Sequence, residues 1–412
     1  MQRFVLISLL LGGLINAYAQ PKLDSLSLGA GYADQVWWSF DGGEQARASQ
    51  TGWDLAFGTG GGAANILMNT GKGNSVWVYP MGDTADWATV DTMGLDSWSP
   101  LYNSTQSWSL GALNAGYDPN DQLDLGWGTY SFITHFVTGD SVFVMQNAAG
   151  AFKKLWIEQL ASGTYTFRYG NLDGTNDTTV SLVKSDFTGK NFGYFSFDTD
   201  ATLDPEPASA DWDLLFTRYT DYAPTPYPVS GVLSNIHTGV SQVYPVDDVE
   251  TFADYNAAPF DSAINHIGWD WKSFSFMTGW SLQDSMVYFV KTQHDAIYKL
   301  VFTDFGGSSS GNFYFTHEEI RATGLDVTQN SIVGVFPNPV TDSHLSIHAD
   351  LAGGNQSVRI LDLQGRLLQH NEFTFAPGLQ RIDLQLPDLA SGMYLVELIQ
   401  NQSRQTSRFL VK

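Results

Sequence analysis

The chain has 412 residues, no cysteine, 20 basic and 43 acidic side chains, and a formal net charge of -23 at pH 7. This acidity argues against nucleic acid as a partner, because its phosphates would be repelled, and it disfavours anionic membrane surfaces. Without cysteine, an exported chain has no disulfides and must rely on an apolar core, which its 14% aromatic content can supply.

Residues 1–19 have the features of a secretory signal peptide. A short positive start is followed by an apolar run from Phe4 to Ile15, and Ala17 and Ala19 occupy the positions that a signal peptidase reads. The run is shorter than the ~20 residues that a membrane span needs, and no later run approaches that length. We therefore expect export and a mature protein without a transmembrane span.

The composition of the remaining chain favours strands. Its 40 glycines and 15 prolines, together with many Thr, Tyr, Trp and Val residues, are typical of short strands joined by turns. No segment shows a sustained helical period with caps, whereas segments such as 142–145, 164–169 and 286–290 have the pattern of β-strands. The sequence predicts an all-β protein.

Much of the chain is an internal repeat. Residues 53–57 (Trp-Asp-Leu-Ala-Phe) recur as 212–216 (Trp-Asp-Leu-Leu-Phe), and strand-like segments surround both in the same order. We predict two tandem antiparallel β domains, residues 20–185 and 186–320. In each copy the Trp and Phe should be buried, and Asp54 or Asp213 should hold a turn within its own copy.

The two copies differ mainly in their loops. Residues 81–125 of the first copy correspond to a shorter segment, 246–267, in the second. The second copy instead has a longer loop within 217–242. Loops on a rigid scaffold are where binding sites usually lie, so we expect specificity to reside in 81–125 and 217–242.

The end of the chain has a different pattern. Residues 321–331 read as a linker, and 332–412 contain about seven short strands, which suggests a small immunoglobulin-like β-sandwich. Its marked positions are Pro337, Asn338, Pro339, Gly365, Arg366, Gly392, Tyr394 and Lys412.

These motifs resemble the type IX secretion system C-terminal sorting domain, the Por secretion tail of Bacteroidota. The resemblance implies export through the periplasm, passage across the outer membrane by the type IX secretion machinery, and then attachment to surface lipopolysaccharide or release. It places the mature protein outside the cell or on the outer-membrane surface.

The repeats resemble, over residues 25–320, the HmuY-like family of exported haem-binding β proteins. The likeness rests on the strand 53–57 and on the run 151–157, whose counterpart is 296–302; a Gly-x-Tyr/Phe-x-Phe strand follows each run. The resemblance implies haem as a candidate cofactor. No local motif allows the ligand positions of the family to be carried over.

Haem would need His or Met axial ligands beside an apolar surface. Aligning the copies places His135 near Met277 and the Met68 segment on the His237 segment. Each copy therefore offers a two-ligand set, Met68 with His135 in the first and His237 with Met277 in the second. The alternative is that these are core methionines and hydrogen-bonded histidines. Capture of haem or a similar small hydrophobic ligand is the leading hypothesis.

Carbohydrate binding or adhesion is the second hypothesis. Tryptophan faces near Asp and Asn side chains suit stacking on sugars, and the long loop of the first copy carries Trp87, Trp98 and Trp108. The alternative is that these tryptophans pack the core or the loop.

Signatures of catalysis are absent from the sequence. It has no Gly-x-Ser-x-Gly elbow, no His-Glu-x-x-His and no phosphate-binding loop. The acidic segment 118–124 lacks the glycine and the distant glutamate of a calcium loop, so a solvated turn is the better interpretation and no metal site is predicted. We expect a non-catalytic, ligand-binding protein of the cell exterior.

Overall fold

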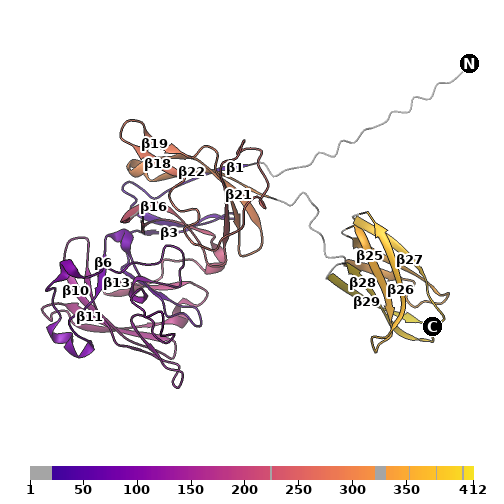
Figure 1. The fold of residues 1–412 in the computed structure, drawn as a ribbon, viewed down its shortest axis with the longest axis horizontal. Coiled ribbons are helices and arrows are strands. Elements are labelled where there is room, and N and C mark those ends of the chain that lie inside the picture. The colour runs from indigo at the N-terminus through magenta and orange to yellow at the C-terminus, as the bar shows by residue number, and fades with distance from the viewer. Residues whose placement is uncertain (1–20, 223–224, 321–330, 352, 377, 401–402) are drawn as a thin grey trace, which may run out of the picture. The chain divides into compact units, whose positions relative to one another are not determined.

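A computed structural model describes residues 21–222, 225–320, 331–351, 353–376, 378–400 and 403–412. It divides into two compact units, residues 1–320 and 321–412, which are described separately. The predicted all-β class is confirmed, because the described chain is nearly all antiparallel strand (Figure 1). The predicted signal peptide and most of the predicted linker lie outside the described residues.

The first unit contains two β-sandwiches. In the first sandwich a four-stranded sheet faces a seven-stranded sheet. The smaller sheet has the order β14 (Ala201–Leu203), β13 (Phe192–Ser196), β4 (Leu55–Gly58), β5 (Ile66–Met68). The larger comprises β12 (Thr178–Val183), β11 (Thr164–Asn171), β10 (Phe152–Ala161), β8 (Val137–Gly139) and β7 (Gly128–Tyr130), with β9 (Val142–Gln146) pairing β10 and β6 (Ser75–Val78).

The second sandwich has the same plan. Its inner sheet has the order β16 (Pro226–Ser234), β15 (Leu214–Tyr222), β2 (Asp34–Ser39), β3 (Gly43–Ser49). Its outer sheet has the order β1 (Lys22–Ser27), β22 (Asn312–Glu319), β21 (Ile297–Phe305), β20 (Val287–Lys291), β17 (Gly239–Val243). A hairpin of β18 (Lys272–Ser275) and β19 (Gly279–Leu282) is a separate two-stranded sheet.

Among the described residues, helical structure is confined to segments of one or two turns in the connections. These are η1 (Thr70–Lys72), η2 (Thr84–Thr89), η3 (Leu95–Ser97), η4 (Ala112–Asn114), η5 (Lys184–Phe187), η6 (Ser209–Asp211) and α1 (Gly307–Ser310). Across the described residues, no helix has both the length and the apolar character that a membrane crossing requires.

The two sequence copies exchange strands. β2 lies in the first copy but pairs with β15 of the second, with Trp38 opposite Leu214. β13 lies in the second copy but pairs with β4 of the first, with Phe195 opposite Leu55. In Figure 1 the indigo β1 accordingly lies among strands from the end of this unit, and β1 pairs with β22. The repeat boundary at 185/186 therefore does not separate the two sandwiches.

The strands at the centre of the unit are buried on both faces. In β2, Trp38 packs into the core of the second sandwich, whereas Trp37 packs into a third core between the two four-stranded sheets. In β15, Phe216 and Leu215 divide in the same way. Alternate side chains of a strand point to opposite faces, so a continuous apolar run here fills two cores. The two sandwiches thus form one continuous body.

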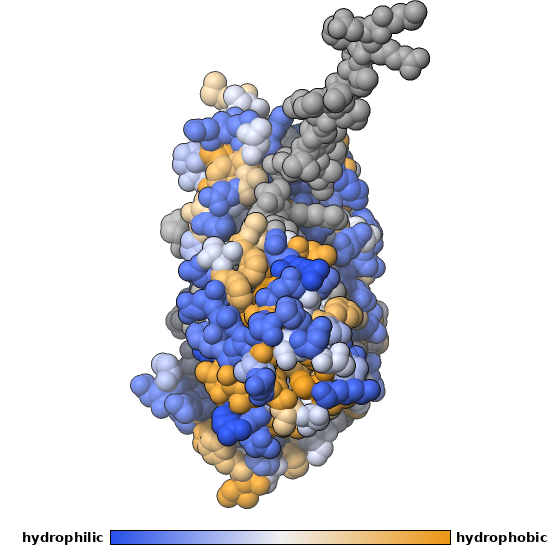
Figure 2. Space-filling model, turned by 90° about the vertical axis from the view of Figure 1, so that its right-hand side faces the viewer, coloured by the Kyte–Doolittle hydropathy of each residue, from blue (hydrophilic) through white to orange (hydrophobic). Residues whose placement is uncertain are grey.

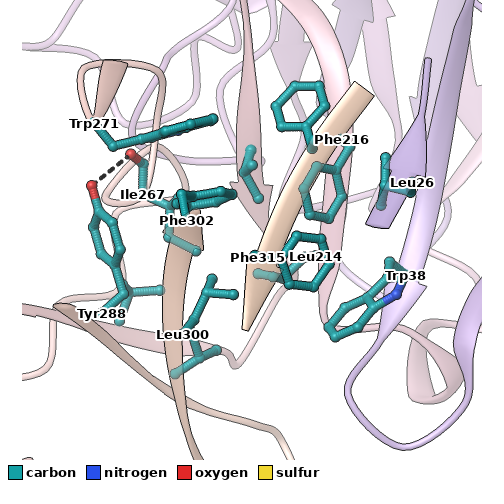
Figure 3. Packing of buried hydrophobic residues seen from close by; sticks show 14 of the residues in the cluster. Leu26, Trp38, Leu214, Phe216, Ile267, Trp271, Tyr288, Leu300, Phe302 and Phe315 are labelled. Carbon is teal, nitrogen blue, oxygen red and sulfur yellow. Dashed lines mark hydrogen bonds between the residues drawn. The ribbon is translucent and has the colours of Figure 1, made fainter. Parts of the chain in front are cut away.

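Aromatic side chains dominate the core of the second sandwich (Figure 3). The rings of Trp271 and Phe302 stack with centroids 3.8 Å apart, and Trp38 meets Phe315 edge to face at 5.2 Å. The hydroxyl of Tyr288 is satisfied because it donates to the carbonyl of Ile267. This packing supplies the cohesion that a chain without disulfides needs.

The repeated Trp-Asp-Leu strand has an equivalent role in both sandwiches, and that role includes a contact that the sequence did not predict. Asp54 Oδ2 accepts a hydrogen bond from the Phe197 amide at 2.8 Å, and Asp213 Oδ2 accepts one from the Phe40 amide at 2.9 Å. Each carboxylate therefore holds a strand from the other sequence copy. The reason is the strand exchange, which places β2 and β13 beside the opposite copy. Asp54 also bonds Lys72 and Asn74 at the η1 turn of its own copy, as predicted.

Residues 331–412 form a separate sandwich of seven described strands. One sheet has the order β23 (Ser331–Phe336), β24 (His344–Leu351), β27 (Gly378–Gln385). The other has the order β26 (Leu367–Phe375), β25 (Gly354–Leu361), β28 (Gly392–Gln400), β29 (Ser403–Val411). Aliphatic side chains from both sheets fill the space between them. On the face of the molecule drawn in Figure 2, hydrophilic and apolar residues are interspersed.

Candidate functional site: a cleft between the two sandwiches

Loops of both sandwiches enclose a cleft of about 940 Å³, called here the inter-sandwich cleft. The first sandwich contributes the glycine loop 60–62, the β7–β8 hairpin and the segment 184–192, and the second contributes 235–237. The long loop 81–125 and the shorter loop 246–267 both reach it. A concave site of this size, built from loops on rigid sheets, is the usual location of a ligand.

The wall of the cleft mixes flat aromatic and amide side chains. Trp108 and Phe192 pack edge to face with ring centroids 5.8 Å apart, and Trp108 Nε1 donates to the Ser234 carbonyl at 2.8 Å. Asn65 Nδ2 donates to the Trp108 carbonyl at 2.7 Å. These bonds fix the tryptophan of the long loop against the frame of both sandwiches.

Two histidines from different sandwiches line this one cleft. His135 lies in the β7–β8 turn and His237 follows β16, and both have left-handed backbone angles, with φ of 58° and 65°. Such angles are uncommon outside glycine, so the fold holds both rings at strained positions. His135 Nδ1 is hydrogen bonded to the Tyr130 hydroxyl at 2.8 Å, and the exposed His237 ring has no partner among the described residues.

The basic side chains of the cleft differ in their partners. Lys184 Nζ donates to the carbonyl groups of Gly60 and Ala63, and burial lowers the pKa of Lys184. No carboxylate in the described chain pairs with it. Lys190 forms an ion pair with Asp204 at 2.5 Å.

A buried network supports the back wall. Asn191 Nδ2 donates to Asn235 Oδ1 at 2.8 Å, which joins the two sandwiches directly behind the cleft. The backbone N–H of Asn191 and the Tyr194 hydroxyl both donate to the Glu206 carboxylate, at 3.1 and 2.8 Å. Burial raises the pKa of Glu206 to about 7, although both hydrogen bonds oppose the shift.

The structure does not bring the two predicted methionine–histidine pairs together. Met68 is a fully buried residue of β5 that points into the core of the first sandwich, whereas His135 is exposed on the cleft. Met277 lies at the tip of the β18–β19 hairpin with 94% of its surface exposed, and it does not line the cleft that His237 lines. Sequence alignment of the copies could not reveal which face of a strand each residue occupies.

The three candidate tryptophans also separate. Trp108 lines the inter-sandwich cleft. Trp87 is buried and donates to Asp177 Oδ2 at 2.9 Å. Trp98 packs on Tyr79 beside a different depression, which has a volume of about 610 Å³.

Sequence reasoning missed Lys184, Asn191, Asn235 and the glycine loop. The run Gly60-Gly61-Gly62, one residue beyond β4, was a detectable signal, because successive glycines leave backbone groups uncovered by side chains. Nothing local marks the two asparagines, which meet only after the strands exchange.

The acidic segment 118–124 forms a turn held by its own hydrogen bonds. Asp118 Oδ1 accepts from the Asn120 amide at 2.9 Å, and Asp124 Oδ2 accepts from the Asp118 amide at 2.6 Å. Over the ranges that the structure describes, no group of three acidic or histidine side chains is arranged to hold a metal ion.

Haem fits the residues of the cleft in part. Two imidazoles are available, and apolar side chains such as Val137, Leu160 and Ile264 lie among the lining residues. The sulfur ligands expected from the sequence are elsewhere. Any axial ligation would therefore come from His135 and His237.

The marked residues of the C-terminal unit have clear local roles. Asn338 Oδ1 accepts from the Leu410 amide at 2.9 Å, which joins the Pro-Asn-Pro segment to the last strand. Gly365 has φ of 79° in the turn before Arg366, whose Nε contacts Asp362 at 3.0 Å. Gly392 begins β28, in which the Tyr394 hydroxyl donates to the Ala390 carbonyl at 2.8 Å. The Lys412 amide donates to Val340 at 3.0 Å.

Residues 334–412 match the model of the secretion system C-terminal sorting domain. The chain therefore carries a type IX sorting tail, as the sequence predicted, and the protein is secreted or displayed at the cell surface. The match does not extend to the repeats, and the HmuY-like resemblance stays a prediction.

No curated protein sequence matches the chain. Among solved structures, dimeric latent PorU from Porphyromonas gingivalis is similar at 9% identity and a TM-score of 0.19, over 84% of this chain and 31% of PorU. The chain thus spans about a third of that protein. The BSP domain of a biofilm-associated protein is similar at 9% identity and a TM-score of 0.20, over 96% of this chain and 81% of that one. Similarities this weak carry no argument about fold or function.

Proposed function

We propose that this secreted or surface protein captures an extracellular ligand, without catalysis, in the inter-sandwich cleft. The observation that carries the proposal is the convergence of loops from both sandwiches on one large concavity with two exposed imidazoles and a fixed tryptophan. The export route is through the periplasm, with the sorting tail recognised by the type IX machinery.

Haem is the first candidate ligand, supported by the two histidines on one cleft. Adding haemin to the purified protein should produce a Soret band that His135→Ala and His237→Ala each shift or weaken. Met277→Ala is the matched control, because that side chain lies on an exposed hairpin tip away from the cleft. A spectrum identical in wild type and both histidine variants would exclude the cleft as a haem site.

A saccharide is the second candidate, supported by Trp108 and the amide side chains around it. Tryptophan stacking and amide hydrogen bonds are the usual chemistry of sugar recognition. On a glycan array, Trp108→Ala should weaken binding by about tenfold, corresponding to roughly 1.4 kcal/mol. Trp98→Ala is the control, since Trp98 lines a different depression; equal losses in both variants would argue against the cleft.

The sorting function of the tail has its own test. Deletion of residues 334–412 should leave the protein in the periplasm of a type IX-competent cell, because the two units are separately compact and the body can fold without the tail. Normal appearance of the truncated protein outside the cell would contradict the assignment.

A further inference from the structure

The inter-sandwich cleft has an electrostatic character opposite to that of the chain. About one residue in ten is acidic and acidic side chains outnumber basic ones 43 to 20. Even so, no aspartate or glutamate lines the cleft, whereas Lys184, Lys190, His135 and His237 do. We infer that the cleft selects ligands bearing a carboxylate or sulfate group, an inference that rests on the ligand-binding function proposed above.

Lys184 supplies the strongest argument. Its ammonium group is half-buried and held by two carbonyl groups of the 60–63 loop, and no described carboxylate neutralises it. A partly desolvated cation loses hydration without a compensating charge, so an incoming anion gains a charge-assisted hydrogen bond at little cost in side-chain ordering. The side chain is already fixed in place before a ligand arrives.

The glycine loop provides neutral donors beside that cation. The amides of Gly61 and Gly62 have no hydrogen-bond acceptor among the described residues. A Cβ built on either glycine would meet nothing within 4 Å, so the space above the loop is open to a ligand. Successive free amides next to an ammonium group suit oxygen atoms of an anion.

Two acidic side chains that bond residues of the lining do not cancel this character. Asp204 is paired with Lys190 and lies outside the lining. Glu206 is buried behind Asn191, and its raised pKa of about 7 keeps a fraction of that carboxyl neutral near physiological pH. Lys184 thus remains the uncompensated charge, and the imidazole of His237 is a further free donor or acceptor.

Two sources could supply such an anion: a uronic-acid oligosaccharide or a tetrapyrrole with carboxylate side chains. The test uses the full mature protein and two matched ligand pairs, namely an oligogalacturonate with its methyl ester, and haemin with its dimethyl ester. Calorimetry for the sugars and absorption titration for the haemins should show that the acid of one pair binds at least about tenfold more tightly than its ester.

Lys184→Gln should remove that preference by weakening the acid about tenfold while leaving the ester unchanged, and Lys184→Arg should restore it. Lys153→Gln, on β10 outside the cleft, is the control. If acid and ester bind equally, the inference fails but the proposed function stands. If none of the four ligands binds, both fail for these ligand classes. A loss of ester binding in Lys184→Gln would show a structural effect and also overturn the inference.

Discussion

The two sandwiches of the body share a plan but differ in how the chain completes them. The first is built from one continuous stretch, β4 to β14, whereas the second combines β15 to β22 with β1, β2 and β3 from the start of the body. Both use an aspartate of the Trp-Asp-Leu strand to hold a strand from the other sequence copy. The comparison shows that the first folded sandwich begins about three strands later in the chain than the first copy of the repeated sequence.

The sandwiches differ again in what their loops provide. The first supplies the glycine loop, Lys184 and the hairpin that carries His135, and the second supplies Asn235 and His237. The equivalent hairpin of the second sandwich, β18–β19, instead exposes Phe276 and Met277 almost completely. The same hairpin position therefore forms part of the cleft wall in the first sandwich and an exposed apolar tip in the second.

The largest predicted effect is from removing residues 21–50. This deletion takes away β1, β2 and β3 and with them Leu26, Val36 and Trp38 of the second core. The second sandwich should lose its cooperative unfolding transition, whereas β9 to β11 of the first keep slow hydrogen exchange. Hydrogen exchange with mass spectrometry measures both. Retained protection in β20 to β22 would contradict the strand assignment.

A permuted body provides the control for that deletion. Residues 210–320 joined to 21–209 by a short linker make each sandwich contiguous in sequence, and the cut falls at the exposed Ala210. The join is short because β1 and β22 are paired, with Lys22 opposite His317. The permuted body should unfold within about 1 kcal/mol of the unpermuted one, since closing nearby termini is usually tolerated.

The two aspartates sharpen the comparison. Asp54 accepts from the Phe197 amide and from Asn74 at 2.8 Å and pairs with Lys72 at 2.7 Å, all in a buried setting. Asp54→Ala should cost about 2–4 kcal/mol in urea unfolding, because it leaves the Phe197 amide without its acceptor and removes one of the two carboxylates paired with Lys72, which keeps Asp198. Asp213→Ala, which chiefly orphans the Phe40 amide, should cost about 1–3 kcal/mol. A larger loss in Asp213→Ala would contradict the view that the Lys72 and Asn74 contacts of Asp54 add to its stabilising role.

The two methionines that the sequence predicted as partners of histidines should differ strongly in their effect on stability. Met68→Ala leaves a cavity in the first core and should destabilise the protein by about 2–4 kcal/mol. Met277→Ala changes an exposed tip and should alter the free energy of unfolding by less than about 0.5 kcal/mol. Thermal unfolding of both variants tests this, and equal effects would contradict the structural placement of one of them.

Glu206 should make stability depend on pH in a defined window. Its folded pKa of about 7 lies above its ordinary value of 4.5, so the protonated form favours the fold. This contribution is complete below about pH 4.5 and is lost as the pH rises to about 7. Glu206→Gln should therefore be more stable than wild type by about 2–3 kcal/mol at pH 8 and similar at pH 4.5. If wild type and Glu206→Gln show the same dependence of unfolding free energy on pH in urea, this role of Glu206 is contradicted.

The sequence predicted the all-β class, the repeat and the sorting tail because these depend on local patterns and on self-similarity. It did not predict the strand exchange, since a repeat read in sequence has no mark for where the folded unit begins. Trp37 and Trp38 look alike in sequence, and only the layer order shows that they enter different cores. Asn191 and Asn235 meet for the same reason, through tertiary pairing that no local pattern encodes.

The central claim is that the ligand lies where the two sandwiches meet. Hydrogen exchange of the mature protein, with and without the acid that binds most tightly in the matched pairs, tests it directly. Exchange should slow in 60–65 and 184–191 of the first sandwich and, at the same ligand concentration, in 235–237 of the second. Slowing confined to one sandwich, or to the β18–β19 tip, would contradict the claim.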